Sequence, residues 1–198
     1  MIKLVIANDK VSKDFIKETI KNYHSYVPST SSVGRRIDWV VFNDDKPIGM
    51  IGIGSSVYPP PKDILKHTKL SIKEYKNKFN SFANNWRFCM RESIRNAGTQ
   101  ILKELRRQAP LYWKQKYNDD LLYLITFVAG GNNGAVYKAD NWSQIGQTSG
   151  LPPHKSISMK WDTHESLKEK YVKPTGENKK LIFFKRIRTK QEHLSSKT

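Results

Sequence analysis

The spacing of apolar residues changes several times along the chain, and each change predicts a new element of secondary structure. The short apolar run 2–6 predicts a first strand. The next segment, 12–24, predicts an amphipathic helix with Ser12 as its N-cap. The apolar face of this helix is formed by Phe15, Ile16, Thr19, Ile20 and Tyr23. The chain therefore begins with a strand followed by a helix.

Strand patterns continue through the middle of the chain, with one lysine-rich interruption. The apolar runs 35–42 and 47–57 are separated by four polar residues, which is typical of a β-hairpin. Three prolines then end the pattern, and 59–80 is predicted to be an exposed lysine-rich insertion. The few apolar anchors of this insertion are Leu65, Ile72, Tyr75 and Phe79. Another strand is predicted within 82–94.

The period then returns to that of a helix. Segment 97–110 predicts a helix that ends at Pro110, because proline cannot donate the next backbone hydrogen bond. Its apolar face is made by Ile101, Leu102 and Leu105. The nearly continuous apolar run 121–128 is typical of a strand covered on both faces, and Phe127 is expected to be plain core.

The segment after this run is arranged as if to hold a ligand. Glycines and asparagines at 130–134 end the strand and permit left-handed backbone angles, and Asn133 is expected to cap a short helix that begins at Ala135. A final strand is predicted at 179–188, and 189–198 is expected to be a flexible tail. The backbone at 130–134 is therefore where a ligand is expected to approach most closely.

Composition limits the class of protein. With 198 residues, the chain is expected to form one domain, 1–188, that includes the insertion. The 35 Lys and Arg against 18 Asp and Glu give a net charge of +17. This charge favours an anionic partner, double-stranded DNA above all, over the alternative of a lysine bias that serves only solubility. The single cysteine, Cys89, excludes an internal disulfide, and no apolar run is long enough to span a bilayer. A cytoplasmic protein with no membrane partner is expected.

Four side chains are candidates for chemistry, and each has a structural alternative. His24 follows a helix and is either a general base or a helix-ending residue that donates to a carbonyl. Asp140 either orients that base or solvates its own turn. Tyr137 and Trp142 either stack on an extruded base or pack in the core.

The basic residues and the candidate metal ligands have alternatives of the same kind. Arg35 and Arg36 open the hairpin and are candidates for contact with DNA phosphates. Arg87 contacts phosphate, pairs with Asp140 or lies exposed at a strand end. The five histidines are scattered and form no metal-binding motif. A divalent metal such as iron would have only His24 and Asp140 as candidate ligands, and their spacing does not mark a site.

The order of predicted elements resembles the GCN5-related acyltransferase (GNAT) fold. The fold class this implies is α/β (α+β), with a central mixed sheet flanked by helices. The run Arg95-Asn96-Ala97-Gly98-Thr99-Gln100 is similar to the pyrophosphate loop of that family, although its last small residue is missing. The resemblance implies acetyl-CoA or a related donor, held by Arg95, Ala97, Gly98 and Thr99 at a helix start.

A second resemblance covers most of the chain. Gly134, Tyr137, Ala139, Asn141 and Trp142, followed by Gly146, match the G-x-x-Y-x-A-x-N-W pattern of the Mom family of phage DNA-modification proteins. Members of that family convert adenine in DNA to an N6-carbamoylmethyl form that blocks host restriction. The resemblance implies an anti-restriction transferase in a phage-infected or lysogenic bacterium. It also implies catalytic roles for His24, Tyr26, Tyr137 and Asp140, with Trp142 against DNA.

Two alternatives to this hypothesis stay open. The same pattern, extended to 146–150, also resembles defence proteins associated with the Druantia system, which implies DNA binding without chemistry. The third hypothesis is a general N-acyltransferase that acts on a small molecule or a protein and has an incidentally basic surface. The donor, the target motif, the metal requirement, the role of the insertion and the oligomeric state are not specified by the sequence.

Overall fold

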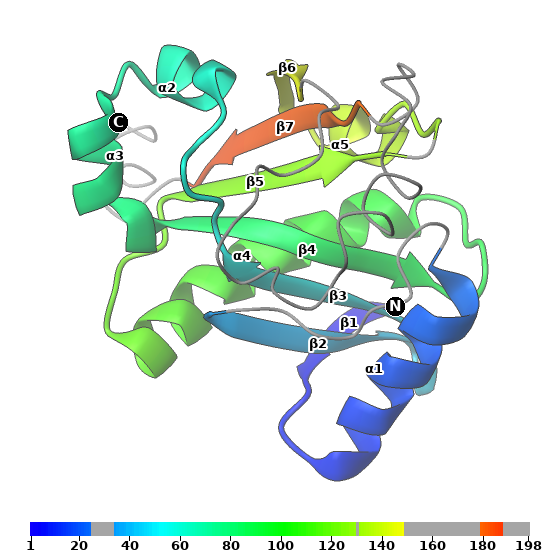
Figure 1. Ribbon diagram of the computed structural model, residues 1–198. Helices are drawn as coiled ribbons and strands as arrows, with labels where there is room; N and C mark the ends of the chain where they lie inside the picture. Colours follow the sequence, from blue (N-terminus) through cyan, green and yellow to red (C-terminus); the bar gives the residue numbers. More distant parts are fainter. Residues whose placement is uncertain (25–33, 130, 149–178, 188–198) are drawn as a thin grey trace, which may run out of the picture.

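The computed structural model describes residues 1–24, 34–129, 131–148 and 179–187, which form a seven-stranded mixed sheet with helices on both faces (Figure 1). The strands, in spatial order, are β1 (Ile2–Ile6), β2 (Arg36–Asn43), β3 (Lys46–Ser55), β4 (Phe82–Met90), β5 (Tyr123–Val128), β7 (Leu181–Arg186) and β6 (Ser143–Gln147). The expected fold class, a central mixed sheet flanked by helices, is confirmed.

One pair of neighbouring strands in this sheet is parallel, and the others are antiparallel. Strands β1 to β4 form an antiparallel meander, and β7 pairs antiparallel with both β5 and β6. Strands β4 and β5 are parallel, and α4 (Ala97–Tyr117) connects them. Their pairing begins at Phe82 and Tyr123 and ends at Asn84 and Ile125. The sheet therefore has a parallel junction near its middle that is only three residues long.

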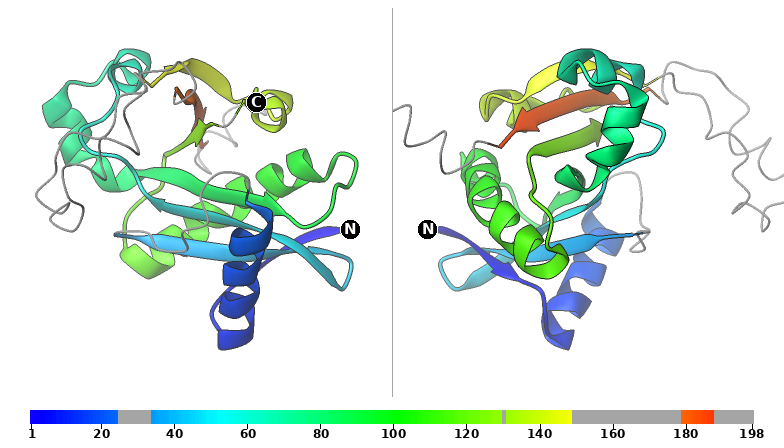
Figure 2. Two further views of the ribbon diagram at one scale, coloured as in Figure 1. Left: turned by 45° about the vertical axis from the view of Figure 1, so that its right-hand side comes forward. Right: turned by 90° about the vertical axis from the view of Figure 1, so that its left-hand side faces the viewer.

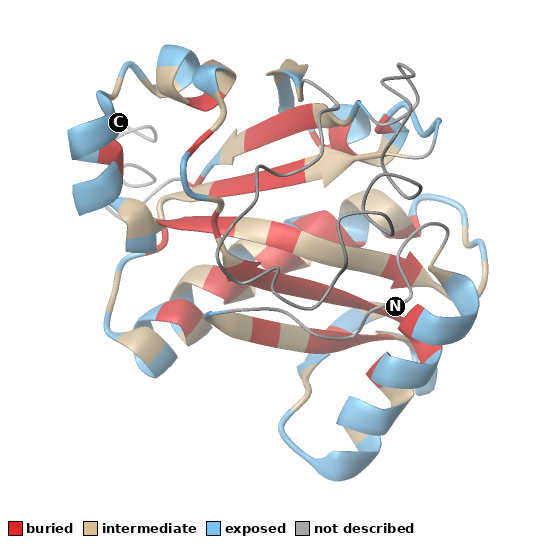
Figure 3. Cartoon of the chain, in the orientation of Figure 1, coloured by how far each residue is buried: buried red, intermediate tan, exposed pale blue. Residues whose placement is uncertain are grey.

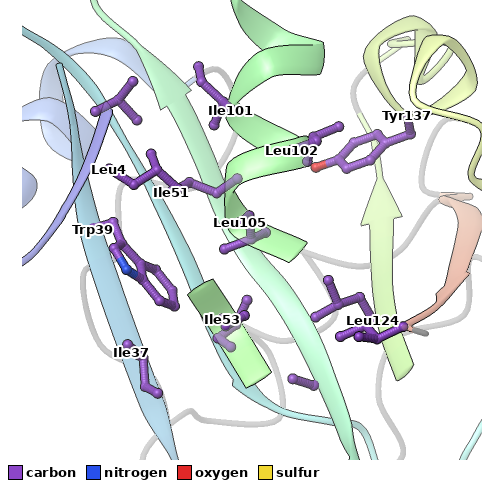
Figure 4. Packing of buried hydrophobic residues seen from close by; sticks show 14 of the residues in the cluster. Leu4, Ile37, Trp39, Ile51, Ile53, Ile101, Leu102, Leu105, Leu124 and Tyr137 are labelled. Atoms are coloured by element: carbon purple, nitrogen blue, oxygen red, sulfur yellow. The ribbon is translucent and has the colours of Figure 1, made fainter. Parts of the chain in front are cut away.

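Successive side chains of a strand point to opposite faces of the sheet, and helices cover both faces. Trp39, Ile51 and Leu124 belong to the same apolar cluster as Ile101 and Leu105 of α4 (Figure 4). On the opposite face, residues of α1 (Lys10–Tyr23) pack on β2 to β4, and residues of α2 (Lys62–Thr68) and α3 (Ile72–Asn77) pack on β4, β5 and β7. Figure 2 shows this arrangement from two sides, and Figure 3 shows that the buried residues follow the strands.

The lysine-rich insertion is anchored differently from the prediction. It forms α2, α3 and a 3-10 turn, Phe79–Ser81. Tyr75 is fully buried, as expected for an anchor, but Ile64, which was not among the expected anchors, is also fully buried, and Ile72 is 56% exposed. The polar Tyr75 hydroxyl is satisfied by a hydrogen bond with the Ser56 hydroxyl at 2.7 Å. The insertion therefore covers a second apolar cluster over β5 and β7 rather than lying free in solvent.

Two helix boundaries differ from the prediction. Helix α1 begins at Lys10 with Asp9 as its N-cap, and the Asp9 carboxylate accepts from the Ser12 N–H at 2.8 Å. Ser12 is therefore inside the first turn. Helix α4 does not end at Pro110 but continues to Tyr117. The extension is stabilised by Trp113, which is fully buried and whose indole N–H donates to the Asn80 carbonyl at 2.8 Å. This tertiary packing offsets the hydrogen bond that proline removes.

The second half contains one strand that the polar pattern did not indicate. Strand β6, Ser143–Gln147, is a mostly exposed edge strand whose pairing with β7 is interrupted by a bulge between Gln144 and Gly146. The short helix α5 (Ala135–Ala139) starts where expected, but its N-cap is Gly134, with a φ of 69°, and not Asn133. The Asn133 side chain, one residue earlier, accepts from the Ala135 N–H at 2.9 Å. None of the helices in the described ranges combines the length and apolar character that crossing a bilayer requires.

Candidate functional site

A cleft opens where β4 and β5 stop pairing. Beyond Asn84 and Ile125 the two parallel strands make no further ladder contacts, and a cavity of about 370 Å³ lies between their carboxyl-terminal halves. We call this cavity the β4–β5 cleft. Its lining consists of His24, Asn85, Trp86, Arg87, Phe88, Thr126, Phe127, Val128, Tyr137, Val136 and 132–135. Phe127 lines the cleft and is only partly buried, so its assignment to plain core was wrong.

The floor of the β4–β5 cleft is a closed network of hydrogen bonds centred on Asn85. Its amide nitrogen donates to the Gly52 carbonyl at 2.8 Å and to the Arg87 carbonyl at 3.0 Å. Its amide oxygen accepts from the Tyr137 hydroxyl at 2.7 Å, and its backbone carbonyl accepts from the Thr126 hydroxyl at 3.2 Å. Asn85 is 4% exposed, so this network ties the split strands and α5 together at a fixed point.

His24 contributes from the end of α1. Its backbone N–H donates to the Ile20 carbonyl at 3.2 Å and closes the last helical turn, while its half-buried side chain lines the cleft. Burial lowers the pKa of His24 below 6.5, and the positive charge of Arg87 lowers it further. The imidazole is therefore neutral near pH 7 and able to accept a proton from a nucleophile.

Trp86 forms a fixed wall of the same cleft. Its ring lies across β3 because Gly52 has no side chain, and a Cβ there would lie 2.4 Å from the indole nitrogen. The indole N–H donates to Asp38 at 3.0 Å, and the Arg36 guanidinium lies 4.0 Å from a ring centroid. Burial raises the pKa of Asp38, while its contacts with Arg36 and Trp86 oppose that change. Arg36 is thus part of the wall that holds Trp86.

The start of α4 has the features of an anion site. It follows the loop after β4, its first turn contains no acidic residue, and no side chain caps its N-terminus. Arg95 and Asn96 are exposed directly before the first turn. A helix N-terminus presents backbone N–H groups and a positive dipole end to a phosphate. Gly98 lies against α5, since a Cβ there would lie 2.4 Å from Val136. The predicted loop therefore lies beside one wall of the cleft.

The G-x-x-Y-x-A-x-N-W pattern has a mainly architectural role in the structure. Tyr137 and Trp142 have ring centroids 5.1 Å apart in an edge-to-face contact. The Trp142 indole donates to Asp140 at 2.9 Å, and Asp140 also forms a buried ion pair with Arg106 of α4. Asn141 takes the positive φ of 56° that turns the chain between α5 and β6. The pattern fixes Tyr137 at the cleft through these contacts.

The structure brings together only part of the predicted catalytic set. His24 and Tyr137 line the β4–β5 cleft from opposite sides of the sheet junction. Asp140 is not part of the lining, and its described partners are Arg106, Trp142 and Lys185, so it does not orient His24. Tyr26 lies outside the described residues.

The predicted DNA-contacting residues are also dispersed. Arg87 lines the cleft, with its guanidinium 4.8 Å from a Trp86 ring centroid. Arg35 directly precedes β2 and does not line the cleft; it forms an ion pair with Asp119, and its guanidinium lies 4.7 Å from the Tyr117 ring centroid. Trp142 is 4% exposed, which leaves its ring no open face for stacking on a base.

Sequence reasoning missed Asn85, Thr126, Trp86 and Arg106. The usable signal was polarity inside apolar strands: Asn85 interrupts the apolar pattern of β4, and Thr126 interrupts β5. A buried polar residue in a central strand needs a partner, so such interruptions mark a point where strands separate or a ligand binds. Within the described residues, no group of three His, Cys, Asp or Glu side chains is placed to hold a metal ion. His24 and Asp140 do not share one cavity.

Comparison with known proteins identifies the fold. No family model matches the sequence, and no curated protein matches it. Among solved structures, the chain is similar to a Bacillus subtilis acetyltransferase in complex with CoA, with a TM-score of 0.57, 7% identity, and coverage of 95% of this chain and 100% of that one. It is also similar to aminoglycoside 6'-acetyltransferase type Ii, with a TM-score of 0.56, 11% identity, and coverage of 96% and 99%.

A third solved structure carries the same ligand as the first. It is an aminoglycoside acetyltransferase in complex with coenzyme A, with a TM-score of 0.52, 9% identity and full coverage of both chains. These likenesses show that the chain has the fold of the GNAT acyltransferases. At such low identity the comparisons define the fold and no particular family within it.

Proposed function

We propose that this protein is an acyltransferase that uses an acyl-CoA donor and a nitrogen nucleophile in the β4–β5 cleft. The observation that carries the proposal is the cleft itself, which lies where two parallel strands separate and is lined by His24 and Tyr137. Two of the similar solved structures are complexes with CoA. A thioester bound there would supply an activated acyl carbonyl.

The residues of this chain would divide the work between holding the donor and moving a proton. Arg95 and the uncapped start of α4, with Gly98 and Thr99, fit a pyrophosphate because they combine positive charge with unshared N–H groups. His24, neutral near pH 7, would accept the proton of the attacking nitrogen. In the balanced reaction an N–C bond forms, the C–S bond breaks, and the proton that His24 takes from the nitrogen passes by way of solvent to the thiolate.

Calorimetric titration with acetyl-CoA tests the donor. We expect one molecule to bind per chain, and Arg95→Gln to weaken binding about fivefold to tenfold by removing one charged contact. Lys103→Gln is the matched control, because Lys103 is an exposed cation in the second turn of the same helix. Absence of acetyl-CoA binding by the unaltered chain would refute the proposed donor.

A finer proposal concerns the acceptor, and it is adenine N6 in double-stranded DNA. It is supported by the net charge of +17 and by the run 134–142, which resembles the G-x-x-Y-x-A-x-N-W pattern of Mom proteins. Tyr137 of this run lies at the cleft. Because a carbamoylmethyl group is joined through a CH2 carbon, its transfer differs from ordinary acylation. The acyl donor and the DNA acceptor therefore need separate tests.

Nucleoside mass spectrometry distinguishes the candidate acceptors. DNA from cells that express the chain is compared with DNA from cells that express His24→Ala. A deoxyadenosine derivative that requires His24 supports DNA modification, and its mass separates acetyl from carbamoylmethyl. Unmodified deoxyadenosine together with tight DNA binding favours the Druantia-like role. Unmodified deoxyadenosine together with acetyl-CoA binding favours a small-molecule or protein acceptor.

A further inference from the structure

The hydroxyl of Tyr137 has a single proton, and the surroundings of Asn85 determine where that proton lies. Both hydrogen bonds from the Asn85 amide nitrogen go to backbone carbonyls, of Gly52 and Arg87. A carbonyl only accepts, so the nitrogen has to face that pair and the amide oxygen has to face Tyr137. The 2.7 Å contact between Asn85 and Tyr137 is therefore one in which the tyrosine donates.

This orientation is held firmly. Asn85 is 4% exposed, and its backbone carbonyl is bonded to Thr126 of the neighbouring strand. A flip of the amide would set its oxygen against two carbonyl oxygens and leave buried polar groups without hydrogen-bond partners, which is unfavourable. Tyr137, 7% exposed, is itself stacked against Phe183 with ring centroids 5.6 Å apart. The Asn85 amide is therefore fixed in its orientation, and the Tyr137 ring is fixed in its position.

We propose that Asn85 is a positioning residue that makes the Tyr137 hydroxyl a hydrogen-bond acceptor toward the β4–β5 cleft. Any group that binds the Tyr137 oxygen from the cleft then has to donate an N–H or O–H. The cleft thereby selects an acceptor substrate with such a donor and orients its lone pair toward the acyl carbon. It also disfavours binding of a carbonyl oxygen at that point. This inference rests on the proposed acyl transfer for its catalytic consequence, but the proton position does not depend on it.

Neutron diffraction from crystals of the full chain in D2O tests the proton position directly. We expect deuterium between the Tyr137 oxygen and the Asn85 amide oxygen. Deuterium directed into the cleft would overturn the proposal. This result is independent of whether the chain binds acetyl-CoA, so failure of the proposed function and failure of this inference are distinguishable.

The catalytic consequence is tested by thiol release from acetyl-CoA, with water as the probe acceptor. We expect Asn85→Ala to lower kcat about fivefold to tenfold, the equivalent of one hydrogen bond, while the dissociation constant for acetyl-CoA changes less than twofold. In a Tyr137→Phe background the same substitution should have no further effect. An equal loss in both backgrounds would mean that Asn85 acts independently of Tyr137 and would refute the proposal.

Two further variants separate positioning from folding. Asn85→Asp keeps an oxygen facing Tyr137 but loses the two amide donors, so it should restore thiol release relative to Asn85→Ala even if it lowers the melting temperature. Ser56→Ala removes a different buried hydroxyl, whose partner is Tyr75 of the insertion and which does not line the cleft. It should retain the unaltered kcat within about twofold. Loss of activity in Asn85→Asp equal to that in Asn85→Ala would contradict the positioning role.

Discussion

The carboxylate of Asp140, at the end of α5, forms a buried ion pair with Arg106 in the middle of α4. The same carboxylate accepts from the Trp142 indole at 2.9 Å. Burial lowers the pKa of Arg106, although the guanidinium keeps its charge at any physiological pH. This contact joins α4 to the segment 134–142, which carries Tyr137, and so helps to hold Tyr137 at the cleft.

We expect Asp140→Asn to lower the free energy of unfolding by about 3 kcal/mol, because it leaves a partly buried guanidinium without its counter-charge. Urea denaturation followed by circular dichroism measures the change. Asp14→Asn is the control, since it breaks the exposed pair with Lys17 and should cost less than about 1 kcal/mol. A similar loss in the two variants would contradict a supporting role for the buried pair.

The pH dependence of acyl transfer should report His24. Because burial and Arg87 lower its pKa, the rate should stay high down to pH 6.5 and fall only below it. Arg87→Gln should move the midpoint upward, toward 6.5, because one repulsive charge is removed. A rate profile measured from pH 5 to 8 checks both statements. A midpoint that Arg87→Gln moves downward would contradict the assignment to His24.

The same residue makes a second, independent pH prediction for stability. The unfolded histidine has a pKa near 6.5, and the folded one is lower, so the unfolded state binds the proton first. The free energy of unfolding should therefore fall as the pH is lowered through 6.5 toward the folded pKa. In His24→Gln this part of the slope should vanish. If the free energy of unfolding varied with pH in the same way in the unaltered protein and in His24→Gln, His24 would have the same pKa in the folded and the unfolded states.

Gly98 should tolerate no side chain, because a Cβ there would lie 2.4 Å from Val136 on α5. We expect Gly98→Ala to destabilise the fold by about 1–3 kcal/mol through overpacking. The double variant Gly98→Ala/Val136→Ala should recover part of this loss, since it removes the colliding methyl groups. Thermal denaturation measures all three proteins. Without any recovery in the double variant, the contact between α4 and α5 would not be the cause.

Cys89 should be unreactive in the folded protein. It is 4% exposed, and burial raises its pKa to about 11, so little thiolate forms at pH 8. Alkylation by iodoacetamide at pH 8, followed by intact-mass spectrometry, should be at least about a hundredfold slower than in urea-unfolded protein. This also means that thiol-release assays detect CoA rather than the chain. Rapid labelling of the native protein would show that the packing of α1 over Cys89 opens readily.

Much of the fold followed from local patterns. The spacing of apolar residues was sufficient to predict the β2–β3 hairpin, α1 and β5, because each has a strong amphipathic or continuous apolar pattern. The predicted end of α4 at Pro110 was wrong, because the burial of Trp113 stabilises the helix by more than Pro110 destabilises it. Edge strand β6 was not predicted, because its extended conformation is stabilised by pairing with β7 and its own polar sequence carries no strand pattern.

The candidate site was less accessible to such reasoning. His24 and Tyr137 were found from residue type and motif, and both line the cleft. Asp140 was expected beside His24, but it pairs with Arg106, a residue 34 positions earlier on another helix. Burial of a carboxylate requires a counter-charge, and which cation supplies it depends on how α4 crosses the sheet.

The sequence alone therefore determined the order and type of most elements, the positive charge and the absence of an internal disulfide, because these depend on composition and on neighbours along the chain. Only the tertiary structure decided that β4 and β5 separate after Asn84, and that the Asn85 amide meets the Tyr137 hydroxyl. These residues are 52 positions apart, and their contact depends on the strand separation and on the closure of α5 over it. No local pattern encodes that meeting, since it is set by the packing of the whole sheet against α4.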